Sequence, residues 1–217
     1  MNAPIRDAAT VIVVRDHATT PRVLMGQRGA KAAFMPSKYV FPGGAVDAQD
    51  TSVPLATPLL ASDYAALRDA STTPSHALAT AAVRELLEET GQRLTAHHAG
   101  TQWAGLTNEA PHASALQFVF RAITPPGRPR RFDARFFMVN ADDLTGDIDD
   151  FSNAEDELSH LHWVPLSEAR ALDVPFITEV VLAEIAARVR TPGPRNVPFF
   201  DNSGAGSVFR YLDLATV

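Results

Sequence analysis

Three acidic residues, Glu85, Glu88 and Glu89, lie close together in the segment RELLEETG. At 100° per residue of helix, Glu88 lies about 60° to one side of Glu85 and Glu89 about 40° to the other. The three carboxylates therefore share one helix face and repel one another unless cations lie between them. Mg²⁺ and Mn²⁺ bind oxygen ligands of this kind. The spacing predicts a divalent metal site; the alternative is a solvated helix face, with Arg84 paired to Glu88.

A helix over residues 75–90 must carry these acids. The segment SHALATAAVRELLEET is rich in Ala and Leu, which favours helix. Ser75 is the expected N-cap, and Gly91 is the expected left-handed residue that ends the helix. Apolar residues occupy the opposite side and predict a buried face: Ala79, Val83, Leu86 and Leu87.

Short β-branched and aromatic segments predict the strands on which this helix packs. Their ranges are 10–16, 22–28, 115–124, 134–141, 161–166 and 208–214. An amphipathic pattern predicts a second helix at 177–190. Strands and helices alternate with several hairpin-like connections, so we expect an α/β sandwich with a mixed sheet. Residues 51–75 are rich in Ala, Ser, Thr and Pro and predict an inserted surface excursion with a short helix near 62–70.

Composition limits the classes of protein and of partner. The chain has 217 residues, of which 46% are hydrophobic, enough for one substantial domain. It has no cysteine, which excludes thiolate metal sites and is compatible with a cytoplasmic location. The net charge of −6 argues against a nucleic-acid partner. No apolar run approaches the roughly 18 residues of a membrane span, and the start of the sequence has no secretory pattern. We therefore expect no membrane partner.

The segments GGAVDAQD and RELLEETG together resemble the signature of the Nudix hydrolases, G-x5-E-x7-R-E-U-x-E-E-x-G-U, in which U is aliphatic. Gly44 matches the first glycine, Asp50 stands where the family usually has Glu, and Gln92 stands where an aliphatic residue is expected. Residues 51–83 intervene where the family has x7. The second half of the signature is matched in order by Arg84, Glu85, Leu86, Glu88, Glu89 and Gly91.

The interrupted signature, with the lead-in FMPSKYVFPGG, resembles a branch of the family that includes peroxisomal coenzyme A diphosphatases. A Leu-Leu-Thr-x-Arg segment, typical of coenzyme A-cleaving members, is absent. The resemblance implies a Nudix-type α/β/α sandwich with a loop–helix–loop catalytic motif. We expect a single domain over 1–217, with the insertion at about 51–75 inside the motif and a C-terminal helix plus tail at about 176–217.

The resemblance also implies metal-dependent hydrolysis of a diphosphate linkage in a nucleoside diphosphate derivative, coenzyme A or its esters included. Mg²⁺ or Mn²⁺ would be held by the three glutamates of the helix and by the carbonyl of Gly44. Gly43 and Arg28 are expected to contact the metal or the substrate phosphate beside this site. Arg84 is expected to orient a neighbouring glutamate. Glu157, in the segment NAEDELSH, is expected as a further metal ligand or as the general base.

Other residues and functions compete with this interpretation. His160 and His162 form a second candidate metal pair, and His97 and His98 are expected in a loop. The arginine-rich turn 128–131 is a candidate anion site, and Trp103 is expected either to stack on a base or to fill a groove. A non-catalytic nucleotide-sensing module on the same fold is the alternative function. A homodimer built through the insertion is a further hypothesis.

Overall fold

The computed structural model describes residues 3–204 and 206–213. A mixed sheet forms its centre, in the order β11-β10-β7-β8-β1-β2-β3, and in addition β4 pairs with β1 and β9 with β2. The strands of this sheet are β1 Ile5–Arg15, β2 Arg22–Arg28, β3 Tyr39–Val40, β4 Gly43–Ala45, β7 Gln117–Ile123, β8 Arg131–Asn140, β9 Leu158–Pro165, β10 Val197–Asp201 and β11 Val208–Leu212. A separate hairpin consists of β5 Thr95–Trp103 and β6 Leu106–Pro111.

The sheet is mixed because two of its pairs are parallel. The long pair β1–β8 runs parallel from Ile5 and Arg131 to Val14 and Asn140, and β7 runs parallel to β10. The pairs β1–β2, β7–β8 and β2–β9 are antiparallel. The predicted α/β class with a mixed sheet is therefore confirmed.

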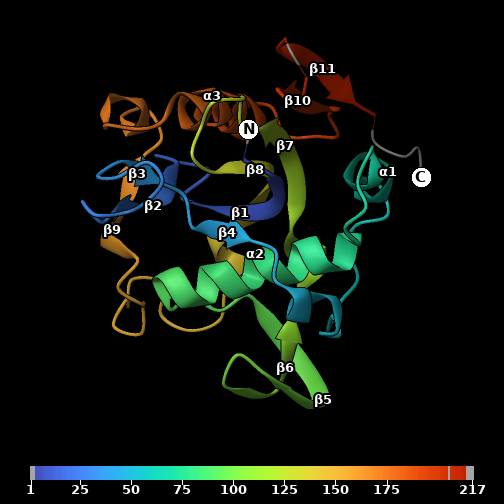
Figure 1. Cartoon of the computed structure of the whole chain (residues 1–217). Helices are drawn as coiled ribbons and strands as arrows, with labels where there is room; N and C mark the ends of the chain where they lie inside the picture. The colour runs from blue at the N-terminus through green and yellow to red at the C-terminus, as the bar shows by residue number, and fades with distance from the viewer. Residues whose placement is uncertain (1–2, 205, 214–217) are drawn as a thin grey trace.

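Two helices cover opposite faces of the sheet (Figure 1). Helix α2, Ser75–Thr90, packs on one face, and α3, Phe176–Arg190, packs on the other. Consecutive strand residues point to opposite faces, so Val11 joins the core under α2 while Ile12 joins the core under α3. Burying each large apolar side chain contributes about 1.5–3 kcal/mol, which fixes α2 against the sheet.

The segment between β4 and α2 is not simply a surface excursion, as its composition predicted. It contains the short helix α1, Asp63–Arg68, but Leu59, Ala66 and Leu67 are buried in the core under α2. The carboxylate of Asp63 accepts a hydrogen bond from the backbone N–H of Phe118 on β7, at 2.8 Å. Apolar and polar contacts thus tie this segment to the sheet.

Several local expectations were wrong. Residues 97 and 98 lie in strand β5 rather than in a loop. Trp103 ends the same strand; it is 9% exposed and packs in the core, so of its two expected roles the structure favours filling space over stacking on a base. Pro74, not Ser75, is the N-cap of α2, so Ser75 is the first helical residue. The structure also contains β10, within the predicted tail, and β11 occupies most of the predicted strand 208–214, whose last residue is outside the described residues.

Within the described ranges, none of the helices combines the length and the apolar character that crossing a membrane requires.

Candidate functional site

The C-terminal half of α2 carries the acidic residues and ends where a loop closes over it. Gly91 has φ +73°, the left-handed conformation expected at that position, and an added Cβ would lie 3.1 Å from Asn153. The backbone N–H of Glu155 donates to the carbonyl of Glu88 at 2.8 Å. The segment 153–157, which leads into β9, is therefore fixed beside the acids.

Strand β4 brings two glycines against the acidic face of α2. The N–H of Gly43 donates to Glu89 Oε2 at 2.7 Å. A Cβ at Gly44 would overlap with the carboxylate of Glu85, so this carboxylate lies directly against the glycine backbone. A Cβ at Gly43 would lie 2.6 Å from the carbonyl oxygen of Ala9 on β1. The predicted proximity of the double glycine and the glutamate helix is present, because β4 pairs with β1 beneath α2.

Arg84 joins the two halves of the motif through a buried contact. Its Nε and Nη2 donate to the two carboxylate oxygens of Asp50 at 3.0 and 3.1 Å, and Asp50 is fully buried. Nη1 donates to Glu85 at 2.8 Å and to Glu88 at 2.9 Å, and Nη2 also donates to the carbonyl of Ala45. Arg84 therefore positions two of the acids. Asp50, whose role was open from the sequence, holds the preceding loop to the helix.

Burial raises the pKa of two of the glutamates. Burial raises the pKa of Glu89 to about 8, against the opposing effect of the Gly43 N–H, and the negative charges of Glu85 and Glu157 add to the rise. Burial also raises the pKa of Glu85 to about 7, although the neighbouring Arg84 favours the charged form. A cation beside such groups restores their charged form.

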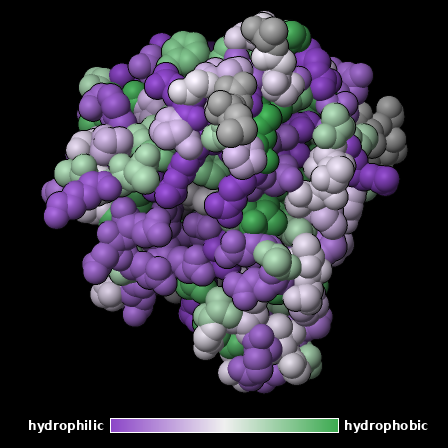
Figure 2. Space-filling view, viewed as in Figure 1, coloured by the Kyte–Doolittle hydropathy of each residue, from purple (hydrophilic) through white to green (hydrophobic). Residues whose placement is uncertain are grey.

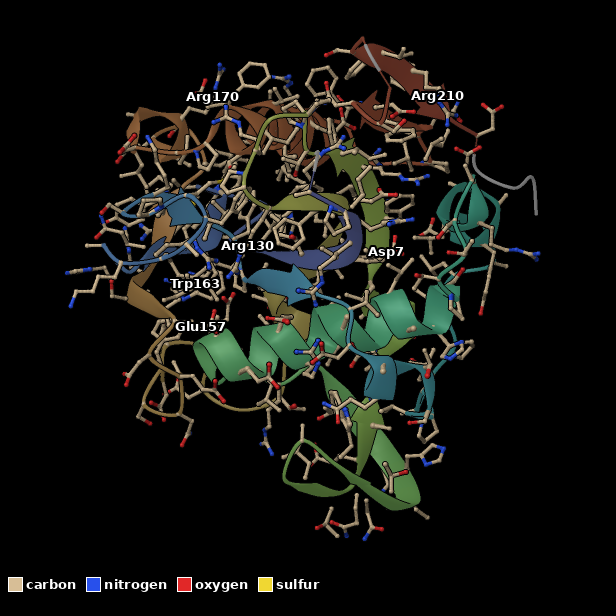
Figure 3. The ribbon with its side chains drawn as sticks, viewed as in Figure 1. Asp7, Arg130, Glu157, Trp163, Arg170 and Arg210 are labelled. Carbon is tan, nitrogen blue, oxygen red and sulfur yellow. The ribbon has the colours of Figure 1, made fainter. Side chains whose placement is uncertain are left out.

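Glu157 and Arg28 lie at the same end of α2. Both act on the charge of Glu89, Glu157 by raising its pKa and Arg28 by lowering it. Glu157 is exposed and lies near the C-terminal end of α2 (Figure 3). The Nε of Arg28 is buried and has no hydrogen-bond partner among the described residues. Hydrophilic residues cover this part of the surface (Figure 2).

The glutamates are not gathered into a finished metal site. Within residues 3–204 and 206–213, no three acidic or histidine side chains are close enough to hold a metal ion as placed. The reason is local: Arg84 pairs with Glu85 and Glu88, and Glu89 is turned to Gly43. Glu89 is also 2% exposed, which does not fit the alternative of a solvated helix face at this position.

The donor set nevertheless fits a hard divalent cation. Glu85, Glu88, Glu89 and Glu157 supply carboxylate oxygens. Glu89 is buried, and no basic side chain in the described part of the chain donates to it. Glu85 is half-buried and accepts a hydrogen bond from Arg84. The absence of a side chain at Gly44 leaves its backbone open to the Glu85 carboxylate. The protein is thus able to supply oxygen ligands from the helix, the glycine strand and the loop before β9.

The other candidates lie elsewhere or have structural contacts. His160 and His162 are exposed, and His162 Nδ1 is 2.7 Å from the carbonyl of His160. Arg131 is buried in β8 and donates to the carbonyls of Thr124 and Asn202, which leaves only the exposed positions 128 and 130 of the arginine-rich turn facing solvent.

Gln92 was noted in the sequence only as a departure from the family pattern. It is buried, and its Nε2 donates to the carbonyl of Asp150 at 2.9 Å. It therefore stabilises the loop after β8 beside the end of α2. A polar residue at an expected aliphatic position was the one signal of this contact in the sequence.

Comparisons with known proteins agree with this geometry. The family model for the NUDIX domain matches residues 73–184, which include the acidic half of the motif and Glu157. Nudix hydrolase 7 of Caenorhabditis elegans is 31% identical over 181 residues, 75% of this chain and 52% of that protein. The chain thus spans about half the length of this curated relative.

Solved structures show the same fold. The crystal structure of a NUDIX hydrolase from Alicyclobacillus acidocaldarius has a TM-score of 0.62 and 26% identity, over 88% of this chain and 99% of that one. The MutT protein of Methanosarcina mazei has a TM-score of 0.52 and 13% identity, over 88% and 99% of the two chains, and supports the fold alone. The family match, the sheet topology and the acidic face of α2 agree, and the chain belongs to the NUDIX domain family.

Proposed function

We propose that this protein hydrolyses a diphosphate linkage in a nucleoside diphosphate derivative, with Mg²⁺ or Mn²⁺ as cofactor. The observation that carries the proposal is the placement of the buried carboxyl of Glu89 and the half-buried carboxyl of Glu85 against the Gly43–Gly44 backbone. Burying a carboxyl costs free energy because burial disfavours its charged form, and a bound cation would offset this cost. Membership of the NUDIX domain family supports the same activity.

Each residue of the site has a proposed role. Glu85, Glu88 and Glu89, with Glu157 and the Gly44 carbonyl, would hold the divalent cation. When bound, the cation supplies neutralisation of the diphosphate charge and makes water more acidic. Arg84 positions Glu85 and Glu88 through the hydrogen bonds from its Nη1. Gly43 holds Glu89 through its N–H.

Two residues would act on the substrate side. The unpartnered Nε of Arg28 is a donor for a phosphate oxygen, because a guanidinium forms strong hydrogen bonds with phosphate. Glu157 is exposed, so its carboxylate is free to accept a proton from the attacking water if it is not a ligand. Glu157 is therefore proposed as a further metal ligand or as the general base.

The substrate class of coenzyme A and its esters is the finer part of the proposal. It is supported by the interruption of the motif between Asp50 and Arg84, which resembles the branch that includes coenzyme A diphosphatases. The interrupting residues are compatible with an intact site, since Asp50 and Arg84 meet in the structure. A cytoplasmic location and a homodimer stay predictions, which cell fractionation and light scattering would check.

The test is a hydrolysis screen over coenzyme A, ADP-ribose, NADH, dinucleoside polyphosphates and nucleoside triphosphates. Turnover should require Mg²⁺ or Mn²⁺, stop with a chelator, and fall steeply in Glu89→Gln. The amide oxygen of this variant can still accept the Gly43 N–H, so the fold should persist. Glu168→Gln, an exposed glutamate after β9, is the matched control. Wild-type turnover in Glu89→Gln would overturn the assignment, and no turnover on any substrate would favour the sensing module.

A further inference from the structure

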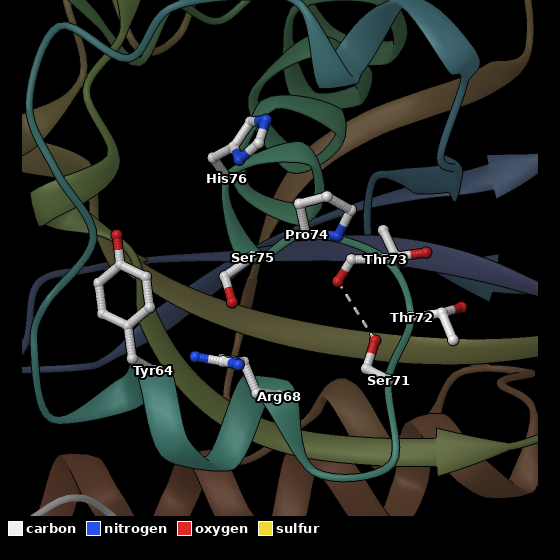
Figure 4. Close-up of a pocket in the computed structure, with 8 residues that line it drawn as sticks. All are labelled: Tyr64, Arg68, Ser71, Thr72, Thr73, Pro74, Ser75 and His76. Carbon is white, nitrogen blue, oxygen red and sulfur yellow. Dashed lines mark hydrogen bonds between the residues drawn. The ribbon is translucent and has the colours of Figure 1, made fainter.

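A pocket lies at the end of α2 opposite the acidic site, between α1 and the first turn of α2 (Figure 4). Its volume is about 350 Å³, and its walls include Tyr64 and Arg68 of α1 and Ser75 and His76 of α2. Helix rise places Ser75 about 20 Å from Glu88. The pocket is therefore separate from the acidic site.

The start of α2 leaves backbone donors unused. Pro74 is the N-cap and provides no side-chain cap. The amides of Ala77 and Leu78 both donate to the carbonyl of Pro74, at 3.0 and 3.3 Å. The amides of Ser75 and His76 have no backbone acceptor among the described residues. Free amides at a helix N-terminus, together with the helix dipole, favour an anion.

The side chain of Ser75 supplies an independent indication. Ser75 is 6% exposed, yet its hydroxyl forms no hydrogen bond with the other lining residues and points into the pocket (Figure 4). The bond drawn within the pocket runs from Ser71 Oγ to the carbonyl of Thr73, at 3.3 Å. The hydroxyl oxygen itself opens onto the pocket and is not an enclosed atom, so it is free to donate to a ligand bound there.

The charge of the pocket is positive. No carboxylate lines it, whereas the guanidinium of Arg68 points toward the Ser75 hydroxyl (Figure 4). Arg68 is exposed and forms no ion pair with any residue in the described part of the chain. Two helices thus bring one hydroxyl and one guanidinium to one space, beside a helix end where two amides have no backbone acceptor.

We propose that this pocket binds a phosphate group, either as inorganic phosphate or as the terminal phosphate of a phosphomonoester. A terminal phosphate offers several oxygens in a tetrahedral arrangement, which suits donors that come from different directions. The site uses no residue of the proposed hydrolytic centre. Phosphate binding here can therefore be tested independently of that activity.

The test is a titration followed by the backbone amide signals of ¹⁵N-labelled protein, with inorganic phosphate in one series and glycerol 3-phosphate in the other. The Ser75 and His76 signals should shift and saturate. Tighter binding of glycerol 3-phosphate would assign the site to phosphomonoesters, and equal or tighter binding of inorganic phosphate would assign it to the free anion. Absence of a saturable shift at these two amides in both series would overturn the proposal.

Two variants and a control make the test specific. Arg68→Met removes the guanidinium, and Ser75→Asp places a negative charge where the ligand would lie while favouring the helix through its dipole. Each should weaken binding at least tenfold with the remaining amide signals in place. Arg170→Met, an exposed arginine before α3, should bind as the wild type does. Wild-type affinity in both pocket variants would contradict the proposed donors.

Discussion

Asp50→Ala tests the contact that joins the two halves of the interrupted motif. Asp50 is fully buried and accepts two hydrogen bonds from Arg84, which is itself 5% exposed. Removing one partner of a buried ion pair costs about 3–5 kcal/mol. In this variant Arg84 still donates to Glu85, Glu88 and the Ala45 carbonyl. The free energy of unfolding should therefore fall by an amount near the lower value.

The assay is urea unfolding followed by circular dichroism. An unchanged dependence of the unfolding free energy on urea concentration shows that the folded and unfolded states of the variant are comparable with those of the wild type. Asp50→Asn keeps the shape and one acceptor, and should lose less stability, about 1–2 kcal/mol. In a double-mutant cycle with Arg84→Met, the two losses should not add, since both remove the same pair. A loss below about 1 kcal/mol in Asp50→Ala, or full additivity, would refute the role of this contact.

The remaining predictions concern the glycines and the loop before β9. Gly43→Ala should destabilise the fold by about 3 kcal/mol in the same unfolding assay, because its Cβ would meet the Ala9 carbonyl at 2.6 Å and strand β1 cannot move aside. Gly44→Ala should lose hydrolytic activity with little change in stability, because the added Cβ would displace the flexible carboxylate of Glu85 from its position in the site. Full activity in this variant would contradict the prediction. Glu157→Gln should lower kcat by about 10²–10⁴-fold if Glu157 is the base, with Glu155→Gln as control. A higher metal requirement at unchanged saturating kcat would instead make Glu157 a ligand.

Much of the fold was predictable because its signals are local. The Ala- and Leu-rich run predicted α2 to within its caps, and β-branched segments predicted β1, β2, β7 and β8. The hairpin β5–β6 was not predicted, because its strands are largely polar and a register shift between His97 and Gln102 interrupts their pairing. Strand β10 was not predicted, because Pro198 lies within it and proline is unfavourable in a strand.

The site was predictable in its residues but not in its contacts. Sequence spacing placed the three glutamates on one face, yet could not show that Glu89 is buried against Gly43. The pairing of Asp50 with Arg84 joins residues far apart in the chain, and no local pattern encodes it. For the same reason, the burial of Leu67 beneath α2 could not be predicted from a segment rich in Ala, Ser, Thr and Pro.

Binding of Mn²⁺, measured by electron paramagnetic resonance, tests most directly whether the acidic face of α2 holds a divalent cation. Wild-type protein should bind Mn²⁺ saturably, and Mg²⁺ should displace it. Glu85→Gln should weaken binding at least about tenfold, while Glu168→Gln should leave it unchanged. Equal Mn²⁺ affinity in the wild type and in Glu85→Gln would contradict the proposed metal site.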